Sequence, residues 1–413
     1  MSQALARGVL LTSLALVGST GLAQAQQLVA PPEVAQQERP GWTVTPSVSV
    51  APLWDSNVAL TSDEQGELED QVLIVGSGLR SNYRGRYGQF LMDYLGSYEF
   101  YRQYPAFDAP DHRARVEAQR SFGRHVSAFV RDSFALSPTT NVPFSDVGLL
   151  ALRRRTTSSN EFRAGFDITA TQRSTLTAAY SNQWVHLEDD ELVQPLLRSG
   201  YSHRADLQFK QRVSQRLTLG GRYDFQHAIV AEGEEAFDIQ HAGGLIEWTL
   251  SPSLQFFGAA GFAWQIAGRG QEAQSAPAFM GELRYLAERT TWSLGYSRTF
   301  LASFGFGGTV QNEELRASVQ VPISRRVELM GRLSARDNDP LSGPLAGVSP
   351  ESLASAGLRA LTATGTVSFE LASWLRFEAF TIANWQDARR AGGQIERTRA
   401  GVRFVTFYPM RLG

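Results

Sequence analysis

The stretch SHRADLQFKQRVSQRLTLGGRYDFQH, residues 202–227, is the clearest example of a pattern that recurs along the chain. Two runs of alternating apolar and polar residues flank a short polar turn, a pattern typical of a β-hairpin. After the turn, one face carries Leu219, Tyr223 and Phe225, and the other carries Arg222 and Asp224. Sheets of soluble proteins alternate in the same way, so the fold depends on whether the pattern recurs along the chain.

The first 25 residues have the pattern of a cleavable secretion signal. Arg7 precedes the apolar run GVLLTSLALVGSTGLA, and Ala23-Gln24-Ala25 forms a small-residue cleavage site. Polar residues interrupt the run, which is short for a membrane-spanning helix, although an uncleaved anchor is the alternative. Residues 26–41 are rich in Pro and Gln, and we expect them to be a flexible leader.

Composition excludes several classes of protein. The chain has no cysteine, so it has neither a disulfide framework nor a thiolate metal site. Its formal net charge of -2 argues against a nucleic-acid binder and against a polybasic membrane-surface protein. Past the signal there is no window of 18 apolar residues, so a membrane-embedded form must be a closed barrel, which alone among sheets satisfies every backbone group in lipid.

The alternating pattern recurs to the C-terminus and predicts an all-β, up-and-down antiparallel barrel of about eighteen strands. We assign residues 42–409 to this barrel and 410–413 to a C-terminal tail. An even strand number brings both chain ends to one side of the membrane. The strands are expected at 42–50, 71–82, 87–102, 110–120, 125–137, 158–171, 174–187, 200–212, 216–230, 236–250, 253–267, 276–287, 290–303, 308–322, 326–338, 353–371, 374–387 and 394–409.

The connections alternate in length, which is the asymmetry of a bacterial outer-membrane barrel. One series consists of short turns such as RGRYG, SFGRH, TQRS, VSQR and LSPS. The other contains longer, polar segments such as 53–69, 138–157, 188–199 and 339–352. We therefore predict export through a cleaved signal to the outer membrane of a Gram-negative bacterium. A secreted, water-soluble β-protein is the alternative.

The strand faces predict which side chains line the lumen. Arginine at the middle of a lipid-facing surface costs roughly 2–4 kcal/mol, so charged residues must point inward. Such a lumen is wide enough for an aqueous channel, or its charges pair across neighbouring strands and fill space. Three tryptophans, Trp264, Trp292 and Trp374, are expected to be interfacial anchors rather than platforms for sugars. The predicted pore-lining residues are Arg113, Arg115, Glu117, Arg163, Asp167, Arg222, Asp224, Glu328, Arg332, Arg336, Arg399 and Arg403.

No arrangement of residues points to catalysis, a cofactor or a metal. The six histidines, at positions 112, 125, 186, 203, 227 and 241, lack the spacing of a zinc protease. The acidic run Asp189-Asp190-Glu191 is expected to be a solvated loop, with weak divalent-ion binding as the alternative. An embedded hydrolase, assembled from different strands, also stays open as an alternative to a non-enzymatic barrel.

Three segments carry a resemblance to a known family. WDSNVAL at 54–60, DYLGSYEFYRQYPAFDAPDH at 93–112 and RSFGRHVSAFVRDSFALSP at 120–138 resemble a family of outer-membrane β-barrels (beta-barrel porin 2-like) that accompany exopolysaccharide and capsule synthesis. SRRVELM at 324–330 is similar to the turns of that family. The resemblance is strongest over residues 42–140 and brings no defined functional residues with it.

The resemblance implies a conduit for exporting an exopolysaccharide across the outer membrane. The expected partners are outer-membrane lipids and lipopolysaccharide, the polysaccharide chain, and periplasmic or inner-membrane export components, with no nucleic acid. Two alternatives remain at this point: a general or solute-selective diffusion porin, and a plugged structural or accessory barrel of the secretion machinery.

Overall fold

The computed structural model describes residues 40–61, 66–138, 156–188, 199–230, 235–267, 273–287, 289–304, 308–341, 357–388 and 394–412. The predicted signal and nearly all of the predicted leader lie outside these ranges, as does Asp189-Asp190-Glu191. None of the helices in the described ranges is long and apolar enough to cross a membrane. A single short 3-10 helix, Pro105–Phe107, interrupts an otherwise all-β structure in these ranges.

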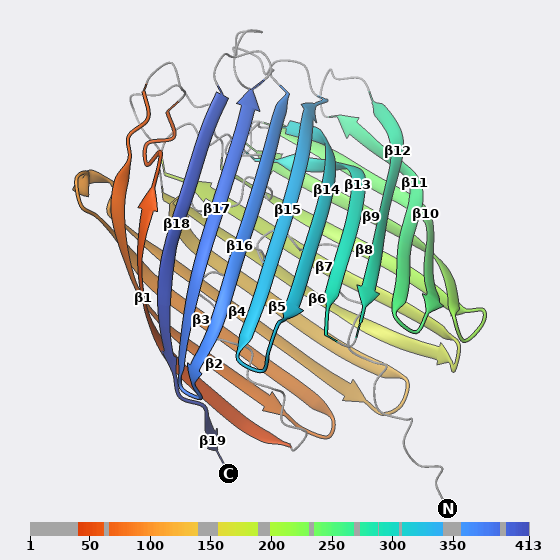
Figure 1. Ribbon diagram of the computed structural model, residues 1–413. Helices are drawn as coiled ribbons and strands as arrows, with labels where there is room; N and C mark the ends of the chain where they lie inside the picture. The colour runs from red at the N-terminus through yellow and green to blue at the C-terminus, as the bar shows by residue number, and fades with distance from the viewer. Residues whose placement is uncertain are drawn as a thin grey trace, which may run out of the picture.

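The strands form one closed antiparallel barrel (Figure 1). Eighteen long strands make its wall, and a short nineteenth follows them. Their bounds are β1 (Gly41–Asp55), β2 (Asp70–Arg84), β3 (Gly88–Tyr101), β4 (Ala109–Phe122), β5 (Val126–Pro138), β6 (Thr156–Thr171), β7 (Ser174–Leu187), β8 (Gly200–Arg212), β9 (Leu217–Val230), β10 (Glu235–Ser251), β11 (Leu254–Ala267), β12 (Gln274–Leu286), β13 (Thr291–Ser303), β14 (Gly308–Pro322), β15 (Val327–Pro340), β16 (Leu358–Ala372), β17 (Leu375–Ala388), β18 (Gln394–Phe407) and β19 (Met410–Leu412).

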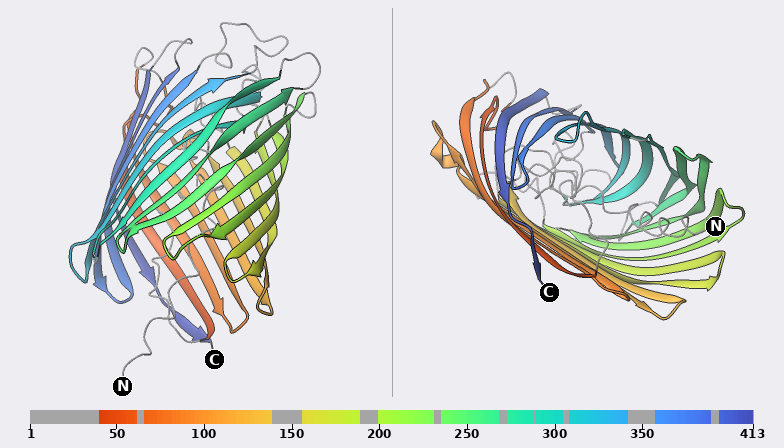
Figure 2. Two further views of the ribbon diagram at one scale, coloured as in Figure 1. Left: turned by 90° about the vertical axis from the view of Figure 1, so that its right-hand side faces the viewer. Right: turned by 60° about the horizontal axis from the view of Figure 1, so that its bottom comes forward.

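Closure is made by β1, which pairs with β2 on one side and with β18 on the other. Each of the strands from β2 to β17 pairs with the strands before and after it in sequence. Closure leaves the sheet without an edge strand, so the backbone amides and carbonyls can be satisfied inside lipid. Viewed from the end where β19 lies, the strands form a ring of elongated cross-section (Figure 2).

The two ends of the barrel differ. β1 starts and β18 finishes at the end where the short turns lie (Figure 1). In bacterial outer-membrane barrels the short turns face the periplasm, so we name this the periplasmic end and the opposite one the external end. The size, the closure and the even strand number are those of channel-forming outer-membrane barrels.

The structure confirms the predicted barrel and its eighteen strands, and it corrects three boundaries. β1 continues to Asp55, so Trp54 and Asp55 belong to the wall and not to the loop predicted at 53–69. β16 begins at Leu358, and most of the earlier residues predicted in this strand, from 353, lie outside the described ranges. Met410–Leu412, predicted as a tail, pairs with Trp42–Val44 of β1.

The outward face of the wall is apolar between two polar margins. On β9 the outward residues from Leu217 to Phe225 are Leu, Gly, Tyr and Phe, and His227 begins the external margin. This apolar span matches the roughly 9–11 residues that a tilted strand needs to cross the hydrocarbon. Lipid contact explains why large apolar side chains such as Leu219 and Phe209 are exposed in the isolated chain.

All eight tryptophans are on strands or turns near the two margins. Seven of them are among the exposed large hydrophobic residues, including Trp264, Trp292 and Trp374. Four lie toward the periplasmic end and four toward the external end, as in the aromatic girdles of outer-membrane barrels. The periplasmic set is Trp42, Trp248, Trp292 and Trp374, and the external set is Trp54, Trp184, Trp264 and Trp385.

Candidate functional site: the barrel lumen

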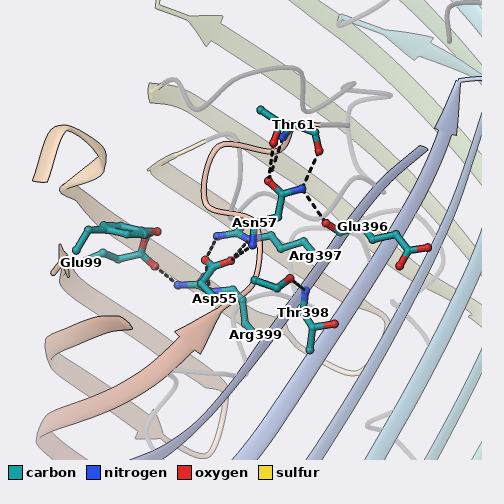
Figure 3. Close-up of polar contacts among 10 residues, drawn as sticks. Asp55, Asn57, Thr61, Glu99, Glu396, Arg397, Thr398 and Arg399 are labelled. Atoms are coloured by element: carbon teal, nitrogen blue, oxygen red, sulfur yellow. Dashed lines mark hydrogen bonds and ion pairs between the residues drawn. The ribbon is translucent and has the colours of Figure 1, made fainter. Parts of the chain in front are cut away.

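A buried ion cluster lies where β1 meets β18 at the external end (Figure 3). Asp55 is 0% exposed and Arg397 is 2% exposed. Arg397 donates from Nε to Asp55 Oδ1 at 2.9 Å and from Nη2 to Asp55 Oδ2 at 2.5 Å. Arg399 lies 3.4 Å from the same carboxylate and donates from Nη2 to Glu99 Oε1 at 2.8 Å. The cluster therefore links β18 to β1 and to β3.

The residues that follow Asp55 hold the same seam through the backbone (Figure 3). Asn57 donates from Nδ2 to the carbonyl of Glu396 at 3.0 Å and accepts from the Thr61 amide at 3.0 Å. Ser56 Oγ accepts from the amide of Thr398 at 2.8 Å. The Asp-Ser-Asn element of the sequence thus helps to close the barrel, and two of its three residues, Asp55 and Asn57, are buried.

Most of the predicted pore-lining arginines lie against carboxylates. Such pairs are short and directional because both partners are charged. The partners are Asp111 for Arg113 at 2.9 Å, Glu117 for Arg115, Asp206 for Arg163 at 2.8 Å, Asp224 for Arg222 at 3.1 Å, Glu314 for Arg336 at 3.0 Å, Glu99 for Arg399 at 2.8 Å, and Glu378 for Arg403. Of these pairs, Arg336 with Glu314 and Arg403 with Glu378 join neighbouring strands, as the space-filling alternative describes, whereas the others lie within one strand or join strands that are not neighbours.

Three predicted lining residues are placed differently. Asp167 accepts from Thr177 Oγ1 at 2.6 Å, and Glu328 accepts from the Gln320 amide. Arg332 has no ion pair or hydrogen bond within the described part of the chain, and its nearest strand neighbours are Ser318 and Thr364. Arg332 is thus a half-buried cation without a partner in the described ranges, in contrast to the other predicted lining arginines.

Asp224 is the centre of a second charged cluster, on β8 to β10. Its side chain is 1% exposed and lies 3.0 Å from Arg204 Nη2 and 3.1 Å from Arg222 Nη2. His241 Nδ1 lies 2.8 Å from the same carboxylate, and His241 Nε2 lies 2.9 Å from Thr299 Oγ1 of β13. His241 therefore bridges the wall and a strand that is not its neighbour in the sheet.

The β13–β14 hairpin leaves the wall at its external end. β13 pairs with β12 only from Thr291 to Arg298, whereas it stays paired with β14 up to Ser303. Both β13 and β14 then lie against β10. In Figure 1 the upper ends of these two strands turn away from β12. The described part of this hairpin therefore leans into the lumen toward the opposite wall.

An apolar cluster seals this contact. Phe300 and Phe304, from the hairpin, are 2% and 1% exposed. They pack with lumen-side residues of β7, β9, β10 and β11, namely Val185, Leu187, Ala228, Val230, Phe237, Ile239 and Ala263. Gly200 of β8 is needed here, because a Cβ at this position would lie 2.6 Å from Phe304 Cδ1. The lumen is thus narrowed at its external end by tightly packed side chains.

Sequence reasoning identified the inward-facing strand positions but not these long-range contacts. Asp55, Glu99, Arg397 and His241 were not among the predicted lining residues. Alternation places Glu99, Arg397 and His241 on inward faces, whereas Asp55 falls in the predicted loop 53–69. The pattern cannot say which residues of other strands these side chains meet. Within the described ranges no group of three or more His, Asp or Glu side chains is arranged to hold a metal ion.

Comparison with known proteins gives likeness of fold at low similarity. No known family matches the chain, and no curated protein matches it. The FrpB iron transporter of Neisseria meningitidis is 10% identical, with a TM-score of 0.45, over 85% of this chain and 62% of its own. OccAB3 of Acinetobacter baumannii is 12% identical, with a TM-score of 0.45, over 89% of this chain and 99% of its own.

OccK2 of Pseudomonas aeruginosa is 13% identical, with a TM-score of 0.44, over 90% of this chain and 98% of its own. The chain thus spans less than two thirds of the FrpB transporter and nearly all of the two Occ proteins. Nothing about solute or partner follows for the present chain from likeness at this level. Its own closed wall, apolar belt and girdles make it an outer-membrane β-barrel.

Proposed function

We propose that the protein is a channel through which small polar solutes diffuse across the outer membrane. The lumen wall carries paired charges and, around Arg332, the hydroxyls of Ser293, Ser318 and Thr364. Such a lining offers hydrogen bonds to polar solutes without holding them tightly, which conduction requires.

The observation that carries this proposal is the inward-leaning β13–β14 hairpin. Phe300 and Phe304 pack against the far wall, and Thr299 bonds to His241 of that wall. A long hydrated sugar chain would have to keep this contact open for as long as it is passing through the barrel. A small solute needs only a narrow path beside it, so the constriction favours the diffusion channel over a polymer conduit.

Export of an exopolysaccharide is the second candidate, and the resemblance of WDSNVAL and its companion segments favours it. In this barrel Asp55, Ser56 and Asn57 hold the contact between β1 and β18. The resemblance of this segment to the family therefore supports a common way of closing the barrel and not a common transported molecule. The inner-membrane and periplasmic export components, and the polysaccharide itself, belong to this second candidate only.

Swelling of proteoliposomes tests the choice. The refolded mature chain is placed in liposomes and exposed to sugars of increasing length, with fragments of the host exopolysaccharide as a competitor. We expect swelling for mono- and disaccharides, a fall with chain length, and no effect of the fragments. Block of swelling by the fragments, together with entry of long oligosaccharides, would favour export, and absence of swelling would contradict the channel.

A further inference from the structure

The periplasmic turns are strongly basic. The eight hairpin turns at this end contain seven arginines and one acidic residue, Glu288. Six of the eight turns contain at least one of these arginines, from the β2–β3 turn round to the β14–β15 turn. The seven are Arg86, Arg124, Arg173, Arg216, Arg289, Arg325 and Arg326, and all of them are exposed.

These arginines do not form ion pairs with carboxylates of the described residues. Within the described ranges none of the seven makes an ion pair, in contrast to most arginines of the lumen. Arg86 instead lies over the ring of Tyr87, 5.1 Å from its centroid, and at the adjoining end of β4 Arg120 lies 5.6 Å from the ring centroid of Phe122. A guanidinium on an aromatic face keeps its donors free for another partner.

Exposed apolar side chains stand beside the same turns. Tyr87, Phe122, Ile323 and Trp374 are all more than half exposed. Side chains of this kind at the margin of an outer-membrane barrel lie at the boundary between hydrocarbon and headgroups. The neighbouring guanidinium groups then lie at the level of the headgroups, because long basic side chains reach from the boundary toward water.

The charge runs round the rim rather than forming a patch on one side. A soluble protein partner would dock against one side or across the mouth, whereas a lipid leaflet surrounds the whole rim. The external connections differ in sign, with fourteen acidic and eight basic residues. The basic rim is therefore a property of the periplasmic end and not of the chain as a whole.

We infer that this ring of arginines binds the phosphate groups of anionic phospholipids in the periplasmic leaflet. The planar guanidinium matches phosphate with two parallel hydrogen bonds. A basic residue at the surface of an anionic leaflet gains about 1 kcal/mol, on the order of a fivefold preference for each headgroup bound. The ring thus fixes the height of the barrel in the membrane and selects its nearest lipids.

Quenching of tryptophan fluorescence by brominated lipids tests this inference. The parent protein is W54F/W184F/W264F/W385F, which keeps the four periplasmic tryptophans. It is refolded in symmetric phosphatidylcholine vesicles that contain a fixed fraction of brominated phosphatidylglycerol or brominated phosphatidylcholine. We expect stronger quenching by the phosphatidylglycerol, and a severalfold smaller preference at high salt because screening weakens surface charges.

The variant R216Q/R289Q/R325Q/R326Q removes charge beside Trp248, Trp292 and Trp374, and we expect it to lose most of the lipid preference. The control R102Q/R359Q removes two exposed arginines of the external end and is expected to keep the preference. A variant with lysine at the same four positions keeps the positive charge. It is expected to keep part of the lipid preference and serves as the control that substitution at these positions does not prevent folding. Equal quenching by both lipids in the parent, or an equal loss of the lipid preference in the control, would overturn the inference. The arginines would then be expected to bind a soluble acidic partner.

Discussion

Asp55 and Arg397 stand 342 positions apart in the sequence and form a buried, two-pronged ion pair. The pair joins the first long strand of the barrel to the last, next to the register contact of Asp55 with Arg399. Since a closed barrel must bring its first and last strands together in one register, this pair identifies that register at the external end.

Breaking the pair is expected to weaken the seam strongly. Replacing one member of a buried pair leaves the other charge buried without compensation and costs about 3–5 kcal/mol. We therefore predict that Arg397→Leu lowers the free energy of unfolding in urea by that amount. Arg359→Ala is the control, since Arg359 is exposed and its partner Asp337 only half-buried, and ion pairs near the surface contribute about 0–1 kcal/mol. Equal losses in the two variants would contradict the role given to the seam.

Gly401 gives an independent test of the same seam. It lies opposite Leu53, and a Cβ at this position would lie 2.5 Å from Leu53 Cβ and 2.6 Å from the carbonyl oxygen of Pro52. We predict that Gly401→Ala destabilises the barrel by about 1–3 kcal/mol, the usual cost of overpacking. Gly365→Ala, where the nearest atom is 3.5 Å away, should change the urea midpoint little. A neutral Gly401→Ala would show that β1 and β18 are not held this close.

Alternation predicted the wall well because every strand has one lipid face, and lipid excludes charge from it. Leu219 and Arg222 lie on opposite faces of β9, as expected. It could not predict that β13 leaves β12 after Arg298, because an inward-leaning hairpin keeps the same alternation as a wall strand. Nor could it predict that Met410–Leu412 adds to β1, since three residues are too few for a periodic pattern.

The two faces of β9 are expected to respond in opposite ways to substitution. Leu219→Arg introduces a charge on the lipid face. We predict impaired insertion into lipid vesicles and a free energy of unfolding lower by up to about 4 kcal/mol. Arg222→Leu should leave folding largely intact, because Arg204 and His241 still compensate Asp224. Insertion is followed by protease protection and stability by urea, and equal behaviour of the two variants would refute the assignment of faces.

Arg332 is expected to influence ion selectivity more than other lumen arginines. Its guanidinium has no partner within the described ranges, so it attracts anions, whereas the charge of Arg284 is offset by Glu282 at 2.8 Å. We predict that Arg332→Leu shifts the reversal potential in a salt gradient toward cation selectivity and that Arg284→Gln shifts it less. A larger shift for Arg284→Gln would show that Arg332 does not face the conducting path.

The β13–β14 hairpin is expected to constrict a lumen that otherwise conducts. The test is the single-channel conductance of three proteins in planar bilayers. They are the wild-type chain, F300A/F304A, and F300A/F304A with the additional change His241→Ala, which removes the polar contact to Thr299. We expect a small conductance for the wild-type chain, a clearly larger one for F300A/F304A, and a further increase when His241 is also replaced. Conductance that is the same in all three proteins, or absent from all of them, would contradict it.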